Sequence, residues 1–378
     1  MLSLITLLAG AATLLTTVVA DTTFPVGVLG TGTMGVTNPP KPTLGTAINQ
    51  TSMARLLTVN SVDDFCLFAP PTPQAISDSE AFEVAWCTKP RNNARLIPDG
   101  TITGVSFLKT DFYVQVMGYG DLTKINIPAG DFGGELDPHG ALGDGNPVGG
   151  NVTSNITGSD QNFAEWMLYI GNGQFCMRVC TNANSTYSAA AMCWHELDLM
   201  GCGFVMPGNY NNNGTFESCE ADVAYPPGWY PTATVNGTPV FSTFAQRFTG
   251  TLAGGSVYTV GDLSTPASAF FTPSSSNCVT TSTIANGINL ANPPTGVPTV
   301  GGGQNSNGGG SGPTQTSSNN GGSKPTGGNS AAGTNSASNA SNSNKPSSAR
   351  GGNVNTQFYP LIALWSALAG VGAVVLFH

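Results

Sequence analysis

Apolar residues follow three different patterns along this chain. Leu2 to Ala20 and Phe358 to Phe377 are nearly continuous apolar runs near the two ends. Between about residue 47 and residue 292, short runs alternate between apolar and polar side chains and are broken by Gly, Pro and Asn. Alternation with a period of two is typical of β-strands, and no long stretch with helical spacing accompanies it. The pattern therefore predicts a mainly β domain, flanked by segments of other kinds.

Two hairpins are predicted within this domain. Residues 105–107 and 112–116 alternate on either side of a short polar break. Residues 165–170 and 174–180 flank a turn that contains Asn172-Gly173, and Asn-Gly between alternating runs is a strong hairpin signal. The domain is long enough to bury a core. We therefore expect a disulfide-linked β-sandwich or barrel-like fold.

Composition divides the rest of the chain. Residues 21–46 form a Gly- and Pro-rich segment before the domain, which we place at 47–292. Residues 293–350 consist mostly of Gly, Ser, Asn, Thr and Pro, and contain almost nothing apolar. Such a segment cannot bury a core and should stay extended or disordered. We interpret it as a glycosylated stalk.

The first apolar run has the features of a secretory signal peptide. It ends in Val18-Val19-Ala20 and is followed by polar, Pro-rich sequence. We predict a signal peptide over residues 1–20, cleaved before Asp21.

The second apolar run has the layout of a GPI-attachment signal over residues 351–378. Small residues come first, then a short polar spacer, then the apolar tail. We expect the lipid on Gly351, Gly352 or Asn353. The alternative is a transmembrane helix, for which the tail is long enough. A retained span normally has Lys or Arg on its cytoplasmic side, whereas only His378 follows here. The anchor is therefore favoured, with the protein on the outer face of the plasma membrane or in a cell wall.

The cysteines agree with export. Their even number predicts a disulfide framework. The eight residues are Cys66, Cys87, Cys176, Cys180, Cys193, Cys202, Cys219 and Cys278. Because Cys66 and Cys87 stand apart from the others, we expect them to pair locally. The other six would cross-link the second half in a pairing that the sequence leaves open, with Cys278 holding its end.

The chain contains little charge. Only 9% of its residues are charged, against about 25% in an ordinary soluble domain, and the formal net charge is −9. An acidic chain without a basic run is a poor ligand for nucleic acid. Glycans would supply the missing solvation, and seven Asn-x-Ser/Thr sequons are present. Their asparagines are Asn49, Asn151, Asn155, Asn184, Asn213, Asn236 and Asn339.

No motif for a cofactor or a metal ion meets its structural requirements. Residues 30–35 read GxGxxG, but the Pro-rich segment that follows cannot open the helix that binds a dinucleotide. His195-Glu196 resembles part of a zincin motif, yet position 199 is Leu. Cysteines near His195 are expected in disulfides rather than on a metal. We therefore expect no cofactor and no metal site.

Catalytic and sugar-binding residues remain open alternatives. Residues 131–144 hold several carboxylates and His139, and we interpret them as a solvated loop rather than a calcium site. A glycosidase needs two carboxylates at a set separation in space. The available carboxylates are Glu135, Asp137, Glu165, Glu196 and Asp198. The sequence identifies no catalytic constellation among them. Trp194, Trp229 and Tyr230 could stack on sugar rings, although burial against disulfides is the commoner role of such residues.

Three stretches carry a family resemblance. Residues 106–116, residues 133–140 and the cysteine-rich part between Phe175 and Cys219 resemble the macrophage-activating glycoproteins of basidiomycetes. The similarity covers roughly Phe24 to Cys278. With its stalk and anchor signal, the chain is most similar to immunoreactive, GPI-anchored mannoproteins of cryptococcal yeasts.

The resemblance implies a mannosylated antigen of the fungal wall or membrane, recognised by host mannose-binding lectins and by T cells. It supplies no catalytic residue. The alternatives are an enzyme acting on wall polysaccharide and a carbohydrate-binding adhesin.

Overall fold

A computed structural model describes residues 23–31, 35–210, 213–251, 255–294 and 296. The predicted signal peptide, nearly all of the stalk, Asn339 and the three candidate anchor residues lie outside these ranges. Among the residues that are described, no helix has the length and apolar character that crossing a bilayer requires.

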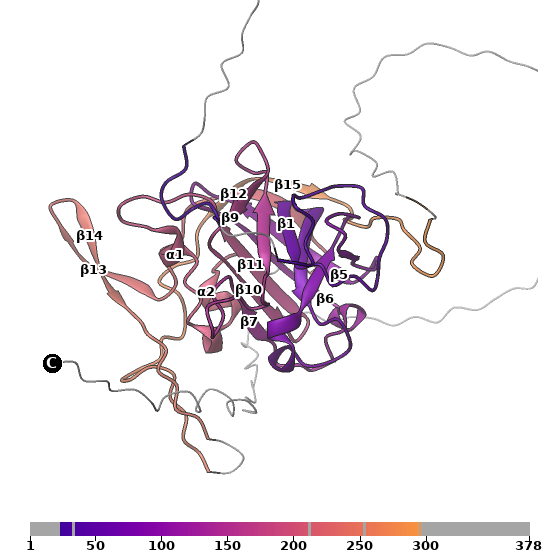
Figure 1. Ribbon diagram of the computed structural model, residues 1–378. Coiled ribbons are helices and arrows are strands. Elements are labelled where there is room, and N and C mark those ends of the chain that lie inside the picture. Colours follow the sequence, from indigo (N-terminus) through magenta and orange to yellow (C-terminus); the bar gives the residue numbers. More distant parts are fainter. Residues whose placement is uncertain (1–22, 32–34, 211–212, 252–254, 295, 297–378) are drawn as a thin grey trace, which may run out of the picture. The chain divides into compact units, whose positions relative to one another are not determined.

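The predicted mainly β architecture is confirmed (Figure 1). One sheet has six strands in the order β4-β3-β2-β1-β8-β9. These strands are β1 (Leu56–Ser61), β2 (Asp64–Ala69), β3 (Val84–Cys87), β4 (Arg95–Leu96), β8 (Asn151–Ser154) and β9 (Gln161–Phe163). The second sheet has seven strands in the order β15-β12-β5-β6-β11-β10-β7. These are β5 (Ile102–Lys109), β6 (Tyr113–Gly120), β7 (Gly134–Leu136), β10 (Trp166–Gly171), β11 (Gln174–Cys180), β12 (Phe216–Ala221) and β15 (Ser275–Thr281).

The remaining elements are short. A separate hairpin pairs β13 (Trp229–Val235) with β14 (Thr238–Thr243). The helices among the described residues have three or four residues each. They are α1 (Ala189–Met192), α2 (Cys202–Val205) and the 3-10 turns η1 (Ile76–Asp78), η2 (Glu80–Phe82), η3 (Leu122–Ile125) and η4 (Asp198–Met200).

Both predicted hairpins are present as β5–β6 and β10–β11. In the second, Gly171 pairs with Gln174, and the two residues between them form the turn. Asn172 and Gly173 have φ angles of 47° and 72°, which is the left-handed conformation that a two-residue turn demands.

The two large sheets pack against each other through one apolar core. Phe65 of β2 stacks on Phe175 of β11, with ring centroids 6.0 Å apart. Phe68 of β2 contacts Trp166 of β10 at 5.5 Å. All four side chains are buried. The N-terminal segment adds to this core, because Val28 is fully buried within it.

All eight cysteines form disulfides. The predicted pair Cys66–Cys87 is confirmed and joins β2 to β3. Cys278 holds the end of the domain, as expected, through Cys219. The other two bonds, Cys176–Cys202 and Cys180–Cys193, attach one segment to strand β11 at two points. We refer to this segment, residues 193–202, as the strap.

The strap and α2 cover the outer face of the seven-stranded sheet. A second, smaller apolar cluster lies beneath them and includes Met117, Met167 and Tyr169 of the sheet. Leu197 of the strap and Phe204 of α2 pack on it. The central strands are consequently buried on both faces, so that polar side chains such as Arg178 are fully enclosed.

Candidate functional site

Both histidines of the described chain lie in one group of ionisable side chains. We call this group the His–carboxylate cluster; it consists of Glu135, Asp137, His139, Glu165 and His195. These five residues come from three separate stretches of the chain, and all of them were candidates from the sequence. The fold brings these stretches together at the β7 edge of the seven-stranded sheet.

Strand β7 explains the position of the two buried carboxylates. Successive side chains of a strand point to opposite faces, so residues two apart share a face. Leu136 enters the core between the sheets, whereas Glu135 and Asp137 lie toward His195. The expectation of a solvated loop over residues 131–144 is therefore wrong for this part, since Glu135 and Asp137 are only 7% and 3% exposed.

The strap places His195 over these carboxylates. Its two ends are bonded to β11 through Cys193 and Cys202. The Tyr169 hydroxyl donates a hydrogen bond of 3.2 Å to the carbonyl oxygen of His195. Leu197 is fully buried and packs the strap onto the sheet. The backbone that carries His195 is thus held by covalent and packing contacts of its own segment.

The cluster has close polar contacts. His195 Nδ1 lies 3.5 Å from Asp137 Oδ1. The same Oδ1 atom accepts hydrogen bonds from the backbone N–H groups of His139 and Gly140, at 2.6 and 2.9 Å. His139 Nε2 lies 2.9 Å from Glu165 Oε2. The two imidazole rings stack, with centroids 4.8 Å apart and planes 14° apart.

Burial dominates the electrostatics of this region. Burial raises the pKa of the Glu135 carboxyl well above its ordinary value, and repulsion from Asp137 and Asp198 acts in the same direction. Glu135 Oε1 has no hydrogen-bond partner. Nearby, burial raises the pKa of Glu80 to about 7, although Glu80 Oε2 accepts a hydrogen bond from Asn146. A protonated or cation-bound state suits such carboxyl groups better than a free anion does.

The other sequence candidates near the cluster are exposed. The Glu196 and Asp198 side chains reach solvent. Trp194 is 36% exposed, and its ring centroid lies 6.1 Å from that of His195. The cluster thus has a buried part, formed by Glu135 and Asp137, and an accessible rim with an aromatic side chain.

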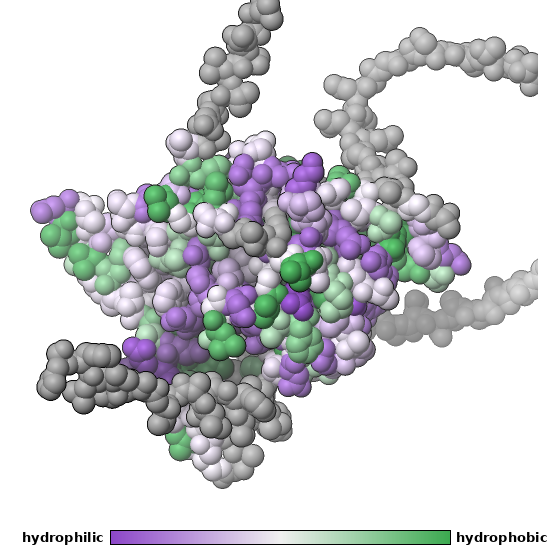
Figure 2. All heavy atoms as spheres, in the orientation of Figure 1, coloured by the Kyte–Doolittle hydropathy of each residue, from purple (hydrophilic) through white to green (hydrophobic). Residues whose placement is uncertain are grey.

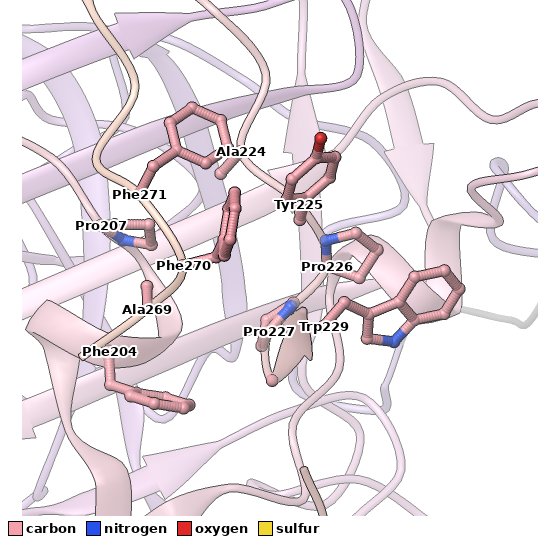
Figure 3. A pocket seen from close by; sticks show the side chains of 11 residues that line it. Phe204, Pro207, Ala224, Tyr225, Pro226, Pro227, Trp229, Ala269, Phe270 and Phe271 are labelled. Atoms are coloured by element: carbon pink, nitrogen blue, oxygen red, sulfur yellow. The ribbon is translucent and has the colours of Figure 1, made fainter. Parts of the chain in front are cut away.

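Trp229 and Tyr230 belong to a different aromatic group. Trp229 contacts Phe241 at 5.0 Å, and the Tyr230 hydroxyl donates to the carbonyl oxygen of Ser268. An adjoining crevice is lined by Phe204, Tyr225 and Phe270 among others, and Trp229 lies at its rim (Figure 3). Its volume of ≈ 10 Å³ is that of about one water molecule. This crevice cannot enclose a sugar ring, and packing of the aromatic rings on one another accounts for the group.

A larger cavity of ≈ 320 Å³ lies beside the N-terminal segment. Its lining includes Phe24, Lys109, Asp111, Thr157 and Asn182. This volume is near the lower end of the range for small-molecule sites, and the lining mixes charged, polar and apolar side chains. No sequence motif marks this cavity, because four separated segments form it.

The described sequons differ in accessibility. Asn155, Asn184, Asn213 and Asn236 are exposed, whereas Asn49 and Asn151 are half-buried. Asn236 lies at the tip of the β13–β14 hairpin, near the exposed Val235 and Val240. Figure 2 shows hydrophobic residues in small separate groups on the face in view, with hydrophilic residues between them.

Comparison with known proteins identifies fungal relatives. Appressorium protein ROW1 of Mycosarcoma maydis is 41% identical over 244 residues, which cover 64% of this chain and 51% of ROW1. Appressorium protein ROW2 of the same organism is 44% identical over 192 residues, which cover 50% of this chain and 65% of ROW2. The chain therefore spans about half of one curated relative and just under two thirds of the other. No family model and no solved structure matches.

These relatives bear on the family resemblance. Both are appressorium proteins of a fungus, which agrees with the fungal part of the resemblance. Neither is named as a macrophage-activating glycoprotein or a mannoprotein. The relatives therefore support a fungal protein, and they do not support assignment to the mannoprotein family itself.

Proposed function

We propose that this protein is a GPI-anchored, mannosylated glycoprotein of the fungal cell surface, an antigen displayed to host mannose-binding lectins and T cells through its glycans. The observation that carries the proposal is the exposure of four sequon asparagines on a disulfide-linked domain. Disulfides suit an exported protein. Exposed sequons would let glycans extend from the domain without disturbing its core.

The similarity to fungal appressorium proteins agrees with a protein of the fungal surface. The stalk would hold the domain away from the membrane, and the wall would surround it. In this view, the glycans rather than a protein pocket form the surface that partners bind.

The first experiment measures binding of the secreted mature protein, made in a mannosylating fungal host, to a soluble mannose receptor. Binding should be lost after enzymatic removal of N- and O-glycans while the circular dichroism spectrum stays unchanged. An Asn184→Gln variant should lose one N-glycan by mass spectrometry, because Asn184 is exposed. Receptor binding that survives complete deglycosylation would overturn the proposal.

The anchor is tested separately on intact cells. Phosphatidylinositol-specific phospholipase C should release the protein, and truncation before Phe358 should send it to the medium. Retention in both experiments would contradict a GPI anchor without affecting the receptor result.

A second candidate function is carbohydrate binding by the domain itself, favoured by the exposed Trp194 next to His195, whose ring stacks on that of His139. Stacking on Trp and hydrogen bonding to a carboxylate are common ways of holding a sugar. Hydrolysis is less well supported, because Glu135 and Asp137 are too deeply buried for a sugar to lie between them. Unglycosylated but oxidised domain should bind glucan, chitin or mannan in a pull-down, and Trp194→Ala should abolish this, whereas Trp229→Ala should not.

A further inference from the structure

Two groups of three potential metal ligands occur among the described residues. In the first, Glu217 lies near Cys219 and Cys278. Those two cysteines are bonded to each other, so they offer no thiolate and the group is not a metal site. In the second, one donor atom each from Glu135, Asp137 and His195 lies within 4.8 Å of the others. All three residues of this group retain their ligating chemistry.

We propose that Glu135, Asp137 and His195 bind one divalent metal ion of the zinc type. This departs from the sequence-based expectation of no metal ligand, and it is independent of the proposed role of the glycans. The missing zincin histidine at position 199 does not matter here, because the other ligands come from β7 rather than from the next helical turn.

An unpartnered buried oxygen points to the ion. Glu135 Oε1 is enclosed, accepts no hydrogen bond from an N–H or hydroxyl group and belongs to a residue that is only 7% exposed. Buried polar atoms nearly always have a partner, and each exception requires an explanation. The Asp137 carboxyl is in hydrogen-bond contact with that of Glu135, but two carboxylates can hold such a contact only by sharing a proton or a cation. A cation between the two carboxylates and the imidazole would satisfy Glu135 Oε1 and balance the charge.

The separation of the donor atoms fits this explanation. Zinc binds imidazole nitrogen and carboxylate oxygen at about 2.0–2.2 Å, so neighbouring ligands of a tetrahedral site lie about 3.4 Å apart. The observed distance between His195 Nδ1 and Asp137 Oδ1 is 3.5 Å. The carboxylate oxygen of Glu135 lies within 4.8 Å of both atoms.

The donor set also selects the class of metal. Calcium prefers six to eight oxygen ligands and a site without nitrogen. One imidazole and two carboxylates suit zinc, with manganese as the main competitor. Three protein ligands leave a further coordination position for water, and His195 is the partly exposed member of the three through which solvent reaches the site. Because the two carboxylates are buried, no sugar can lie between them.

Residues around the ligands hold them in place. The N–H groups of His139 and Gly140 fix the Asp137 carboxylate. The Tyr169 hydroxyl and two disulfides fix the strap that carries His195. Support of this kind from surrounding groups is a regular feature of protein metal sites.

The test uses tag-free mature protein, secreted after truncation before Phe358 and stripped with EDTA. Equilibrium dialysis against Zn²⁺, followed by elemental analysis, should give one ion per molecule. Glu135→Gln should weaken binding at least tenfold. Glu217→Gln is the matched control, because it makes the same chemical change five strand positions away in the same sheet, and it should bind zinc like the wild type.

A second variant keeps the test informative if Glu135→Gln folds poorly. His195→Gln changes a partly exposed side chain and should also lose the ion, together with the zinc-dependent rise in Tm that the wild type shows. Parallel dialysis against Ca²⁺ should give no bound ion. The proposal is overturned if stripped wild-type protein takes up no more zinc than Glu135→Gln and its Tm does not respond. In that case Glu135 is a neutral buried acid that shares a proton with Asp137.

Discussion

The two faces of the seven-stranded sheet are built by different means. The inner face packs on the six-stranded sheet through large apolar side chains, including Phe65, Phe175 and Trp166. The outer face has a smaller apolar cluster and also encloses Arg178. Arg178 donates hydrogen bonds to the Gln115 side chain and to the carbonyl oxygen of Met192, and its guanidinium lies 4.0 Å from the centre of the Tyr113 ring.

The two faces differ in how much apolar surface their covers bury. Two sheets bury enough apolar surface to hold each other. The outer cover contains helices of only four residues, α1 and α2, which cannot form independently in water. The disulfides of the strap hold these short helices on the sheet, which their own stability would not do. Ionisable groups accumulate on the outer side because covalent bonds, rather than apolar packing alone, keep that cover in place.

The largest effect is expected from a cavity on the inner face. Phe175→Ala should lower the free energy of unfolding by about 3–5 kcal/mol, because Phe175 is fully buried against Phe65. Denaturant unfolding followed by circular dichroism measures this change. Val235→Ala, at a position 56% exposed, is the control and should stay within about 0.5 kcal/mol of wild type. A similar loss for both variants would refute the assignment of the inner core.

Removing one strap disulfide should have a smaller and more local effect. Replacing Cys176 and Cys202 together by Ser should cost about 2–4 kcal/mol. Hydrogen exchange should rise in residues 193–202 and stay slow in β5 and β6, because the inner core does not depend on this bond. If hydrogen exchange rose equally in all strands, the outer cover and the inner core would unfold together, and the two faces would not be independent.

The smallest change concerns the pH dependence of stability. Burial raises the pKa of Glu83 well above its ordinary value, with repulsion from Glu80 and Asp131 adding to the shift and the Ser79 hydroxyl opposing it. The unfolded chain releases this proton at lower pH than the folded chain does, so stability is full in acid and falls as pH rises toward the folded pKa.

Glu83→Gln should therefore flatten the decline in Tm between pH 5 and pH 8. The exposed Glu220→Gln is the matched control and should leave the decline unchanged. An identical slope in wild type and Glu83→Gln would mean that Glu83 titrates alike in the folded and unfolded chains.

Local sequence signals predicted local structure well. The Asn172-Gly173 turn and the alternation on either side of it gave β10 and β11 with their turn. The isolated pair Cys66 and Cys87 gave the first disulfide. Both features involve residues that are close together in the chain, so the conformational preference of the turn residues and the spacing of the cysteines are enough to predict them.

The His–carboxylate cluster could not be predicted in the same way. Its histidines are far apart in sequence and meet only because β7 pairs with β10 and the strap is bonded to β11. The Gly-rich composition of residues 131–144 suggested a solvated loop, whereas pairing with β10 buries Glu135 at the sheet edge. Pairing between distant strands depends on the whole fold, so a short sequence motif does not predict it.

The strap also has a consequence for resistance to proteolysis. Both of its ends are bonded to the same strand, at Cys176 and Cys180 of β11. A protease that cuts the exposed peptide between Trp194 and Glu196 would therefore release neither fragment. Each new end would stay bonded to a strand whose neighbours lie on both sides. A single cleavage outside the cell would leave the domain nicked but in one piece.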